Sequence, residues 1–236
     1  LQLLAAAATL GYWAKMGAFP LSGVGLTVGI LFLVGGTNAM NLLDGMNGLA
    51  AGVSFLASLG LGILAALNGQ DLIVVLSLAL AGAALGFLPY NFPRGRIFMG
   101  DAGSLSLGFV LSGLAAQLAF KSAGLGGFLA PFLVFGLPLM DTIFAMARRF
   151  LGMTDLFSGD REHVYDLLAR RRLGERKTVL AMWGITMGLC GLAVAVNKSA
   201  LPLAVSVAVI AVASLAAWAV RLGALGSTLS QGLRLS

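Results

Sequence analysis

The chain has 236 residues, of which 59% are hydrophobic and 10% are charged, and its mean hydropathy is +0.97. This composition excludes an ordinary water-soluble domain and indicates an integral membrane protein. The net charge of +6 does not point to nucleic acid, because the basic residues sit in a few loops between apolar runs. The single cysteine, Cys190, excludes an internal disulfide and a multi-cysteine metal site.

The apolar runs predict an all-α fold, a polytopic transmembrane helix bundle with about eight spans. A helix needs roughly 20 residues to cross a bilayer core, and the abundant glycine and alanine allow close helix packing. The predicted spans are residues 1–14, 22–37, 48–67, 71–90, 104–120, 126–147, 178–196 and 199–220. Residues 1–220 are therefore expected to form a single transmembrane domain. Because the sequence opens on Leu1 and not on Met, we expect the natural chain to begin further upstream.

The linkers between these spans fall into two sets if successive spans alternate in direction. One set, which holds twelve of the fifteen Lys and Arg residues, contains residues 38–47, 91–103, 148–177 and the tail 221–236. The positive-inside rule places this set in the cytoplasm. Every acidic residue except Asp71 lies on or near the same side. Carboxylates from distant parts of the chain are thus expected to meet at one membrane face.

Four polar residues follow the second predicted span at intervals of three, namely Asn38, Asn41, Asp44 and Asn47. Positions i and i+3 share one face of a helix, so their oxygens are expected to form the hard, oxygen-rich patch that Mg²⁺ prefers. The alternative is that Asn and Gly residues only cap the helix that begins near Gly48.

The stretch NFPRGRIFMGDAGS, residues 91–104, is too polar to face lipid and joins two predicted spans. Asp101 precedes the span that starts at Ser104, where free backbone N–H groups attract phosphate. A carboxylate there repels phosphate unless a cation bridges them, so Asp101 is a candidate Mg²⁺ ligand; the alternative is a simple N-cap. Arg94 is expected either to neutralise an anionic ligand or only to mark the cytoplasmic side. Phe98 either faces lipid or stacks on a base.

Asp141 is an ionisable residue near the cytoplasmic end of the predicted span 126–147. Such a residue is a candidate for function, because placing it in a membrane is costly. The alternative is an ion pair with Arg148 or Arg149 on the same helix.

The longest linker, residues 148–177, predicts an amphipathic helix that starts at an N-cap at Asp160 and stops at Gly174. His163 and Asp166 would share its polar face, and the charge of His163 could respond to phosphate. The alternative is a surface helix whose histidine is only structural.

Four motifs, in chain order, carry a resemblance to a known family: NAMNLLDGMNGLAAG, NFPRGRIFMGDAGSLSLGF, DTIFAMARR and DREHVYDLL. They resemble the polyprenyl-phosphate N-acetylhexosamine-1-phosphate transferases, which include phospho-N-acetylmuramoyl-pentapeptide transferase. The resemblance covers about residues 1–195, and FSGDREH is similar to the branch that uses UDP-N-acetylglucosamine-type sugars. It implies transfer of a sugar 1-phosphate from a UDP-sugar to undecaprenyl phosphate, with release of UMP, at the cytoplasmic face of the plasma membrane.

The resemblance also implies roles for individual residues. The catalytic residues would be Asp44, Asn47, Asp101 and His163, with Asp101 and Asn41 binding Mg²⁺ or Mn²⁺. The substrate-binding residues would be Asn38, Asn91, Arg94, Phe98 and Asp166, with Phe98 stacking on uracil. The partners would be a UDP-N-acetylhexosamine, a polyprenyl phosphate and the membrane; a homodimer is compatible with this interpretation, and nucleic acid is not expected.

The sequence departs from the family pattern in three places. Asn47 stands where the second Asp of DGxDG is usual, and Tyr165 and Asp166 replace further histidines. The family's paired aspartates would precede Leu1. These departures support a second hypothesis, a non-catalytic relative. A third hypothesis, a transporter of anions, requires polar residues at the middle of paired spans and an internal repeat, whereas the polar residues here cluster at one face.

Overall fold

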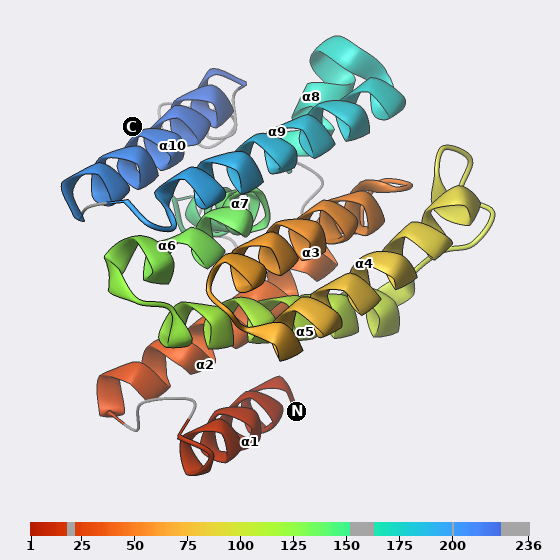
Figure 1. Cartoon of the computed structure of the whole chain (residues 1–236). Coiled ribbons are helices and arrows are strands. Elements are labelled where there is room, and N and C mark those ends of the chain that lie inside the picture. Colours follow the sequence, from red (N-terminus) through yellow and green to blue (C-terminus); the bar gives the residue numbers. More distant parts are fainter. Residues whose placement is uncertain (18–21, 152–162, 200, 223–236) are drawn as a thin grey trace.

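A computed structural model describes residues 1–17, 22–151, 163–199 and 201–222. Its helices, in chain order, are α1 (Gln2–Lys15), α2 (Gly23–Leu43), α3 (Leu49–Leu67), α4 (Asp71–Asn91), α5 (Gly100–Lys121), α6 (Gly124–Val134), α7 (Gly136–Leu151), α8 (Val164–Leu168), the π-helix η1 (Ala169–Leu173), α9 (Gly174–Val196) and α10 (Leu201–Arg221). The described residues contain no strand, which confirms the predicted all-α class. Figure 1 shows α1 and α10 on opposite sides of the bundle.

Five helices of the described part are long and apolar enough to cross a membrane: α2, α3, α4, α5 and α9. The bent pair α6 and α7 can make a sixth span. α1 has 14 residues and α10 is counted only as the shorter apolar segment Val205–Arg221, so the predicted number of about eight spans is not confirmed. Each predicted span nevertheless coincides with one helix, or with the bent pair.

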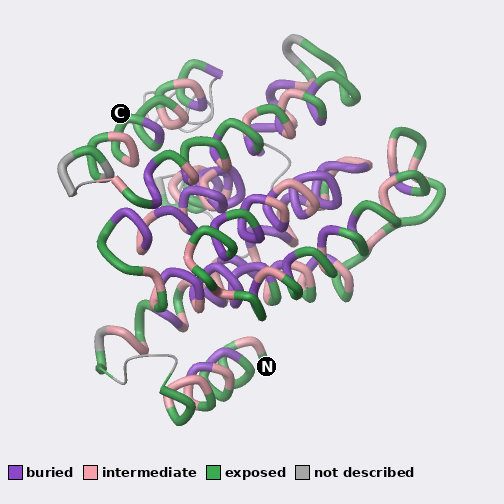
Figure 2. Tube along the Cα trace, viewed as in Figure 1, coloured by how far each residue is buried: buried purple, intermediate pink, exposed green. Residues whose placement is uncertain are grey.

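α3 lies at the centre of the bundle and packs against α4 and α9. In the membrane span of α3, 72% of the residues are buried within the protein, compared with 22% in the span of α4. Most of α4 therefore faces the surroundings of the bundle. Figure 2 shows this contrast along the two helices. Small residues such as Gly52 and Gly60 lie among the buried residues of α3 and allow the neighbouring helix α9 to approach closely.

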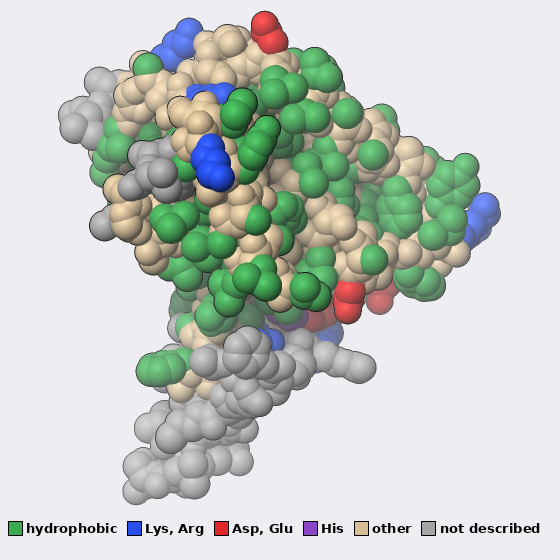
Figure 3. All heavy atoms as spheres, turned by 90° about the horizontal axis from the view of Figure 1, so that it is seen from below, with side chains coloured by type: hydrophobic (Ala, Val, Ile, Leu, Met, Phe, Trp, Pro, Cys, Tyr) green, Lys and Arg blue, Asp and Glu red, His purple; other side chains and the backbone are tan. Residues whose placement is uncertain are grey.

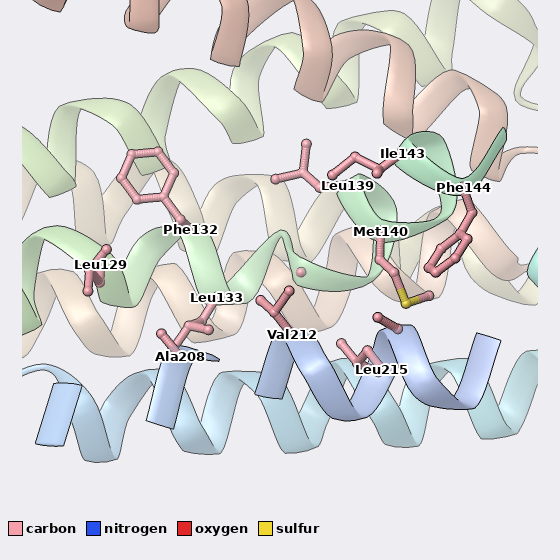
Figure 4. Close-up of a pocket in the computed structure, with 12 residues that line it drawn as sticks. Leu129, Phe132, Leu133, Leu139, Met140, Ile143, Phe144, Ala208, Val212 and Leu215 are labelled. Carbon is pink, nitrogen blue, oxygen red and sulfur yellow. The ribbon is translucent and has the colours of Figure 1, made fainter. Parts of the chain in front are cut away.

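The predicted span 126–147 is broken into two helices that bend by 67°. α6 ends at Val134 because Pro138, four residues further on, has no N–H to donate to the Val134 carbonyl. The break leaves an apolar pocket of about 370 Å³ between α6, α7 and α10, into which Leu133, Met140 and Leu215 face (Figure 4). The bend turns α7, which carries Asp141, towards the end of the bundle that holds the polar linkers.

The segment before α9 differs from its prediction. The predicted N-cap Asp160 and most of the predicted tail, residues 223–236, lie outside the described residues. The helix that follows is not continuous, because α8 has five residues and gives way to the π-helix η1. Gly174, with a φ of 68°, ends η1 where the sequence predicted a stop.

Candidate active site

The polar linkers meet at one end of the bundle. The C-terminal ends of α2, α4 and α7 and the N-terminal ends of α5 and α9 all lie there, while Asn68 after α3 donates to Asn197 after α9 at the other end. Figure 3 shows acidic and basic side chains gathered beside the histidine on this part of the surface. The predicted convergence of distant carboxylates is therefore present in the fold.

Asn41 connects the first two predicted motifs. Its Nδ2 donates to Oδ1 of Asp101 at 3.1 Å and to Oγ of Ser104 at 2.9 Å, across about 60 residues of sequence. Asp101 lies in the first turn of α5, and its side chain makes no N-cap hydrogen bond. Gly48, which caps α3, also has no side-chain cap. Asp101 is therefore not the N-cap of α5, whereas Gly48 does occupy the N-cap of α3, as the alternative interpretation expected.

Close packing of α2 on α5 brings these motifs together. A Cβ at Gly36 would lie 2.7 Å from Cβ of Ser112, and one at Gly108 would lie 2.8 Å from Cα of Thr37. The two backbones therefore approach more closely than larger side chains would allow. This contact sets the register in which Asn41, at the end of α2, reaches the start of α5.

Asp44 ends α2 as its C-cap and is half-buried. Burial, and to a smaller extent repulsion from the Asp101 carboxylate, raise the pKa of Asp44 to about 6. A divalent cation beside the two carboxylates would offset the repulsion that Asp44 experiences. Asn41 faces Asp101 with its Nδ2, which is a donor, and not with its amide oxygen.

The raised pKa of Asp44 predicts a measurable dependence of stability on pH. Because the folded protein binds this proton more tightly than the unfolded chain, ionisation of Asp44 costs stability as the pH rises from its ordinary pKa of 3.8 to about 6. We expect Asp44→Asn to melt at a higher temperature than the wild type above pH 6 in EDTA, and at a similar temperature below pH 4. Thermal unfolding across this range, with Asp71→Asn as control, tests the difference. A wild type that gains stability over Asp44→Asn as the pH rises would contradict it.

Asn91 holds the two polar loops against each other. It is 3% exposed; its Oδ1 accepts from the backbone N–H of Gly48, and its Nδ2 donates to the carbonyl of Ile97 at 2.8 Å. Trp183 of α9 donates through Nε1 to the Gly48 carbonyl at 3.2 Å. The oxygen and the NH₂ group of the Asn91 side chain both make hydrogen bonds within the protein. Asn91 would therefore support substrate binding indirectly, by fixing the two loops.

Gly48 has a φ of 82°, and a Cβ there would lie 2.6 Å from Cβ of Phe92. We expect Gly48→Ala to lower the free energy of unfolding by about 1–3 kcal/mol, through backbone strain and this clash. Gly69→Ala is the matched control, because Gly69 has a φ of 66° and no atom within 4 Å of an added Cβ. Denaturant unfolding in detergent should show the larger loss at residue 48. Equal losses of unfolding free energy in the two variants would mean that the clash with Phe92 adds nothing to the backbone strain.

A polar cavity of about 110 Å³ opens between these loops, and it is lined by Asp44, Gly45, Met46, Asn47, Asn91, Phe98 and Met99. Phe98 is 73% exposed at this cavity, and Arg94 is exposed on the same loop. Asn47 packs against Gly95 and also lines a second cavity, of about 190 Å³, with Arg176. Of the predicted substrate-binding residues, Asn91 and Phe98 line the first cavity.

His163 pairs with Asp141, which sequence reasoning did not include among the catalytic residues. Nδ1 of His163 lies 2.7 Å from Oδ2 of Asp141, and Oδ1 of Asp141 accepts from the backbone N–H of Val164 at 2.7 Å. Within the described residues, Asp141 does not pair with Arg148 or Arg149, the alternative that its spacing suggested. The costly burial of a charge in a membrane span was the signal that pointed to Asp141.

Tyr165 links this pair to the Asp44 turn. Its ring stacks on that of His163 with centroids 5.2 Å apart, and its hydroxyl donates to the Leu42 carbonyl at 2.8 Å. A Cβ on Gly45 would collide with the same hydroxyl, so the turn closes directly on Tyr165. The residue that replaces a family histidine thus positions the segment of His163.

Two other predicted residues differ in their surroundings. Asn38 donates to Oε1 of Gln2 on α1 at 2.9 Å and to the Val34 carbonyl, so its side chain joins α1 to α2 and not to the Asp101 cluster. Asp166 is half-buried one turn from His163. Burial raises the pKa of Asp166, although the charges of His163 and Arg170 oppose this shift.

The fold and site define a class of protein, a polytopic helical membrane protein with a polar site built from the loops at one end of its bundle. The family model for glycosyl transferase family 4 matches residues 1–119, about half of the chain, and the chain belongs to this family. The membership that the four motifs predicted is therefore confirmed.

Curated relatives share long stretches with this chain. A Bacillus subtilis (strain 168) protein named "Probable undecaprenyl-phosphate N-acetylglucosaminyl 1-phosphate transferase" is 39% identical over 165 residues, covering 70% of this chain and 46% of that protein. A decaprenyl-phosphate N-acetylglucosaminephosphotransferase of Mycobacterium leprae (strain TN) is 34% identical over 203 residues, covering 74% and 51%. A phospho-N-acetylmuramoyl-pentapeptide-transferase of Moorella thermoacetica (strain ATCC 39073 / JCM 9320) is 54% identical over 85 residues, covering 36% and 27%. The chain spans about half or less of the length of these relatives.

Proposed function

We propose that this protein transfers N-acetylglucosamine 1-phosphate from UDP-N-acetylglucosamine to a polyprenyl phosphate and releases UMP. Family membership and the names of the relatives support the reaction class. The observation that carries the proposal is the contact of Asn41 with Asp101 and Ser104, which joins two motifs distant in sequence in one polar site. The sequence FSGDREH favours N-acetylglucosamine over the pentapeptide-bearing sugar.

Mg²⁺ is the proposed cofactor, with Mn²⁺ as a substitute. Asp44 and Asp101 fit such a cation, because the Asp101 carboxylate disfavours the charge of Asp44 and hard oxygen ligands suit Mg²⁺. When bound, the cation would neutralise charge that develops on the reacting phosphates. Asn41 is positioned to hold Asp101 in place through its Nδ2.

The chain's own residues would orient the two substrates. Phe98, exposed at the polar cavity, offers a face for the uracil ring, and Arg94 on the same loop offers a positive charge for the diphosphate. The lipid phosphate would attack the sugar-linked phosphorus while the bond to UMP breaks. A phosphate monoester with a second pKa of roughly 6 is largely a dianion at neutral pH, so direct attack needs little help from a base.

The proposed location is the plasma membrane, with the polar site at its cytoplasmic face. The support is the distribution of charge, since the linkers that form the site carry most of the basic residues. A polyprenyl phosphate would keep its chain in the bilayer and its phosphate at the same level as the site.

A direct assay tests the proposal with the natural chain that contains these residues. The donor is UDP-N-acetylglucosamine labelled with ³²P at the sugar-linked phosphate, and the acceptor is undecaprenyl phosphate in detergent. We expect label in the lipid, an equal amount of UMP, and loss of both in EDTA. A folded protein without transfer would identify a non-catalytic relative, and label that crosses proteoliposomes without lipid product would identify a transporter.

A further inference from the structure

Asp141 uses both of its carboxylate oxygens to hold the segment that carries His163. The two residues come from α7 and from the residue just before α8, and they are 3% and 4% exposed. Oδ2 lies 2.7 Å from Nδ1 of His163, and Oδ1 accepts from the N–H of Val164 at 2.7 Å. A carboxylate with two short contacts to adjacent residues fixes both the position and the rotation of the imidazole ring.

The arrangement also selects a tautomer. An ionised carboxylate only accepts hydrogen bonds, so Nδ1 of His163 must carry the proton that it donates to Asp141. Nε2 then lies on the side of the ring away from Asp141. Among the described residues, no hydrogen bond to Nε2 is present. This nitrogen is left to interact with something else.

Tyr165 lies between the His163 ring and the turn that carries Asp44. Tyr165 stacks on His163 with the two ring planes 2° apart, and the Tyr165 hydroxyl is bonded to the Leu42 carbonyl. The same hydroxyl contacts Gly45. The pair is therefore connected, through one tyrosine, to the edge of the polar cavity that Asp44 lines.

We propose that Asp141 is a positioning residue, which holds His163 with Nδ1–H towards α7 and presents Nε2 to a phosphate group of a substrate. This inference rests on the proposed function for the identity of the phosphate. When the phosphate binds, Nε2 takes up a proton from water, and this Nε2–H donates a hydrogen bond to a phosphate oxygen. The charge of the ring then lies between the Asp141 carboxylate and the phosphate, an arrangement that stabilises it from both sides.

Nitrogen NMR tests the tautomer, because His163 is the only histidine of these 236 residues. The protein is purified with a tag free of histidine and labelled with ¹⁵N-histidine, and long-range proton–nitrogen correlations identify the protonated nitrogen. We expect the Nδ1–H form in the wild type at neutral pH. A wild type in the Nε2–H form would overturn the proposal, whatever its activity.

Asp141→Asn is expected to invert this tautomer. The Asn oxygen must still accept from the Val164 N–H, so its amide NH₂ faces Nδ1, which then accepts, and the proton moves to Nε2. Asp166→Asn is the matched control, because Asp166 acts on His163 through its charge and a hydrogen bond with the His163 backbone, and its change removes no contact of the imidazole ring with Asp141. An Asp141→Asn protein that keeps the Nδ1–H form would overturn the proposal.

Kinetics distinguish positioning from a purely structural role. For Asp141→Asn we expect kcat of sugar-phosphate transfer to fall about 10–100-fold, with a small change in KM for UDP-N-acetylglucosamine and a melting temperature near that of the wild type. Unchanged kcat in a protein with the inverted tautomer would refute the role of Asp141. If the wild type has the Nδ1–H form but transfers no sugar phosphate, the proposed function fails and the tautomer assignment stands.

Discussion

Asp101→Asn is expected to lower Mg²⁺-dependent transfer by about 100-fold or more, the size of effect seen when one electrostatic contact to a reacting group is lost. Asp101 lies exposed in the first turn of α5, and its carboxylate interacts with that of Asp44 at the end of α2. Asparagine keeps the oxygen that accepts from Asn41, so the shape of the site should persist. The substitution removes one negative charge, which lowers the affinity of the site for the cation.

The same change should not unfold the protein. Because the Asp101 carboxylate helps to raise the pKa of Asp44, its removal should lower that pKa and leave the melting temperature in EDTA at or above that of the wild type. Asp71→Asn is the matched control, since Asp71 is exposed in the first turn of α4, at the other end of the bundle. Radiolabel transfer across a Mg²⁺ titration measures both variants. Full turnover by Asp101→Asn at low Mg²⁺ would remove Asp101 from the cation site.

The helices and the meeting of the two main motifs could be predicted from the sequence. Apolar runs of membrane length leave few choices of fold, because every backbone N–H and C=O in lipid must be satisfied within a helix. Alternation of the spans then requires the linkers at residues 38–47 and 91–103 to lie on the same side, and Asn41 does reach Asp101. Of the four polar residues at intervals of three, Asn41 reaches Asp101 through its Nδ2, while Asn38 turns to α1.

The Asp141 partner could not be predicted, because local spacing favoured a different one. Arg148 and Arg149 lie two turns away on the same helix, whereas His163 lies 22 residues away on another segment. The 67° break before α7 and the π-helix η1 determine where these segments meet, and neither follows from an apolar pattern. Trp183 of α9 donates to the Gly48 carbonyl. This contact could not be predicted, because an aromatic residue in a membrane span is common.

Phe98→Ala is expected to raise KM for UDP-N-acetylglucosamine roughly 5–150-fold, with kcat near that of the wild type. A large aromatic ring that is 73% exposed at a polar cavity, on a loop held by Asn91, is arranged to stack on a planar ligand. Stacking of a base on an aromatic side chain contributes about 1–3 kcal/mol, which corresponds to this range. Since uracil is remote from the reacting phosphorus, the contact should contribute equally to ground state and transition state.

Two further variants separate stacking from contact with lipid, the alternative that the sequence left open for Phe98. Phe98→Trp should keep KM near the wild-type value, because its ring also presents a face to uracil. Ile97→Ala is the matched control, since Ile97 is the 51% exposed neighbour whose carbonyl, and not its side chain, accepts from Asn91. If Phe98 only faced lipid, all three variants would share the wild-type KM for the donor. Competition by UMP gives the same comparison without the acceptor, because the ring should strengthen binding of the free nucleotide as much as that of the UDP-sugar.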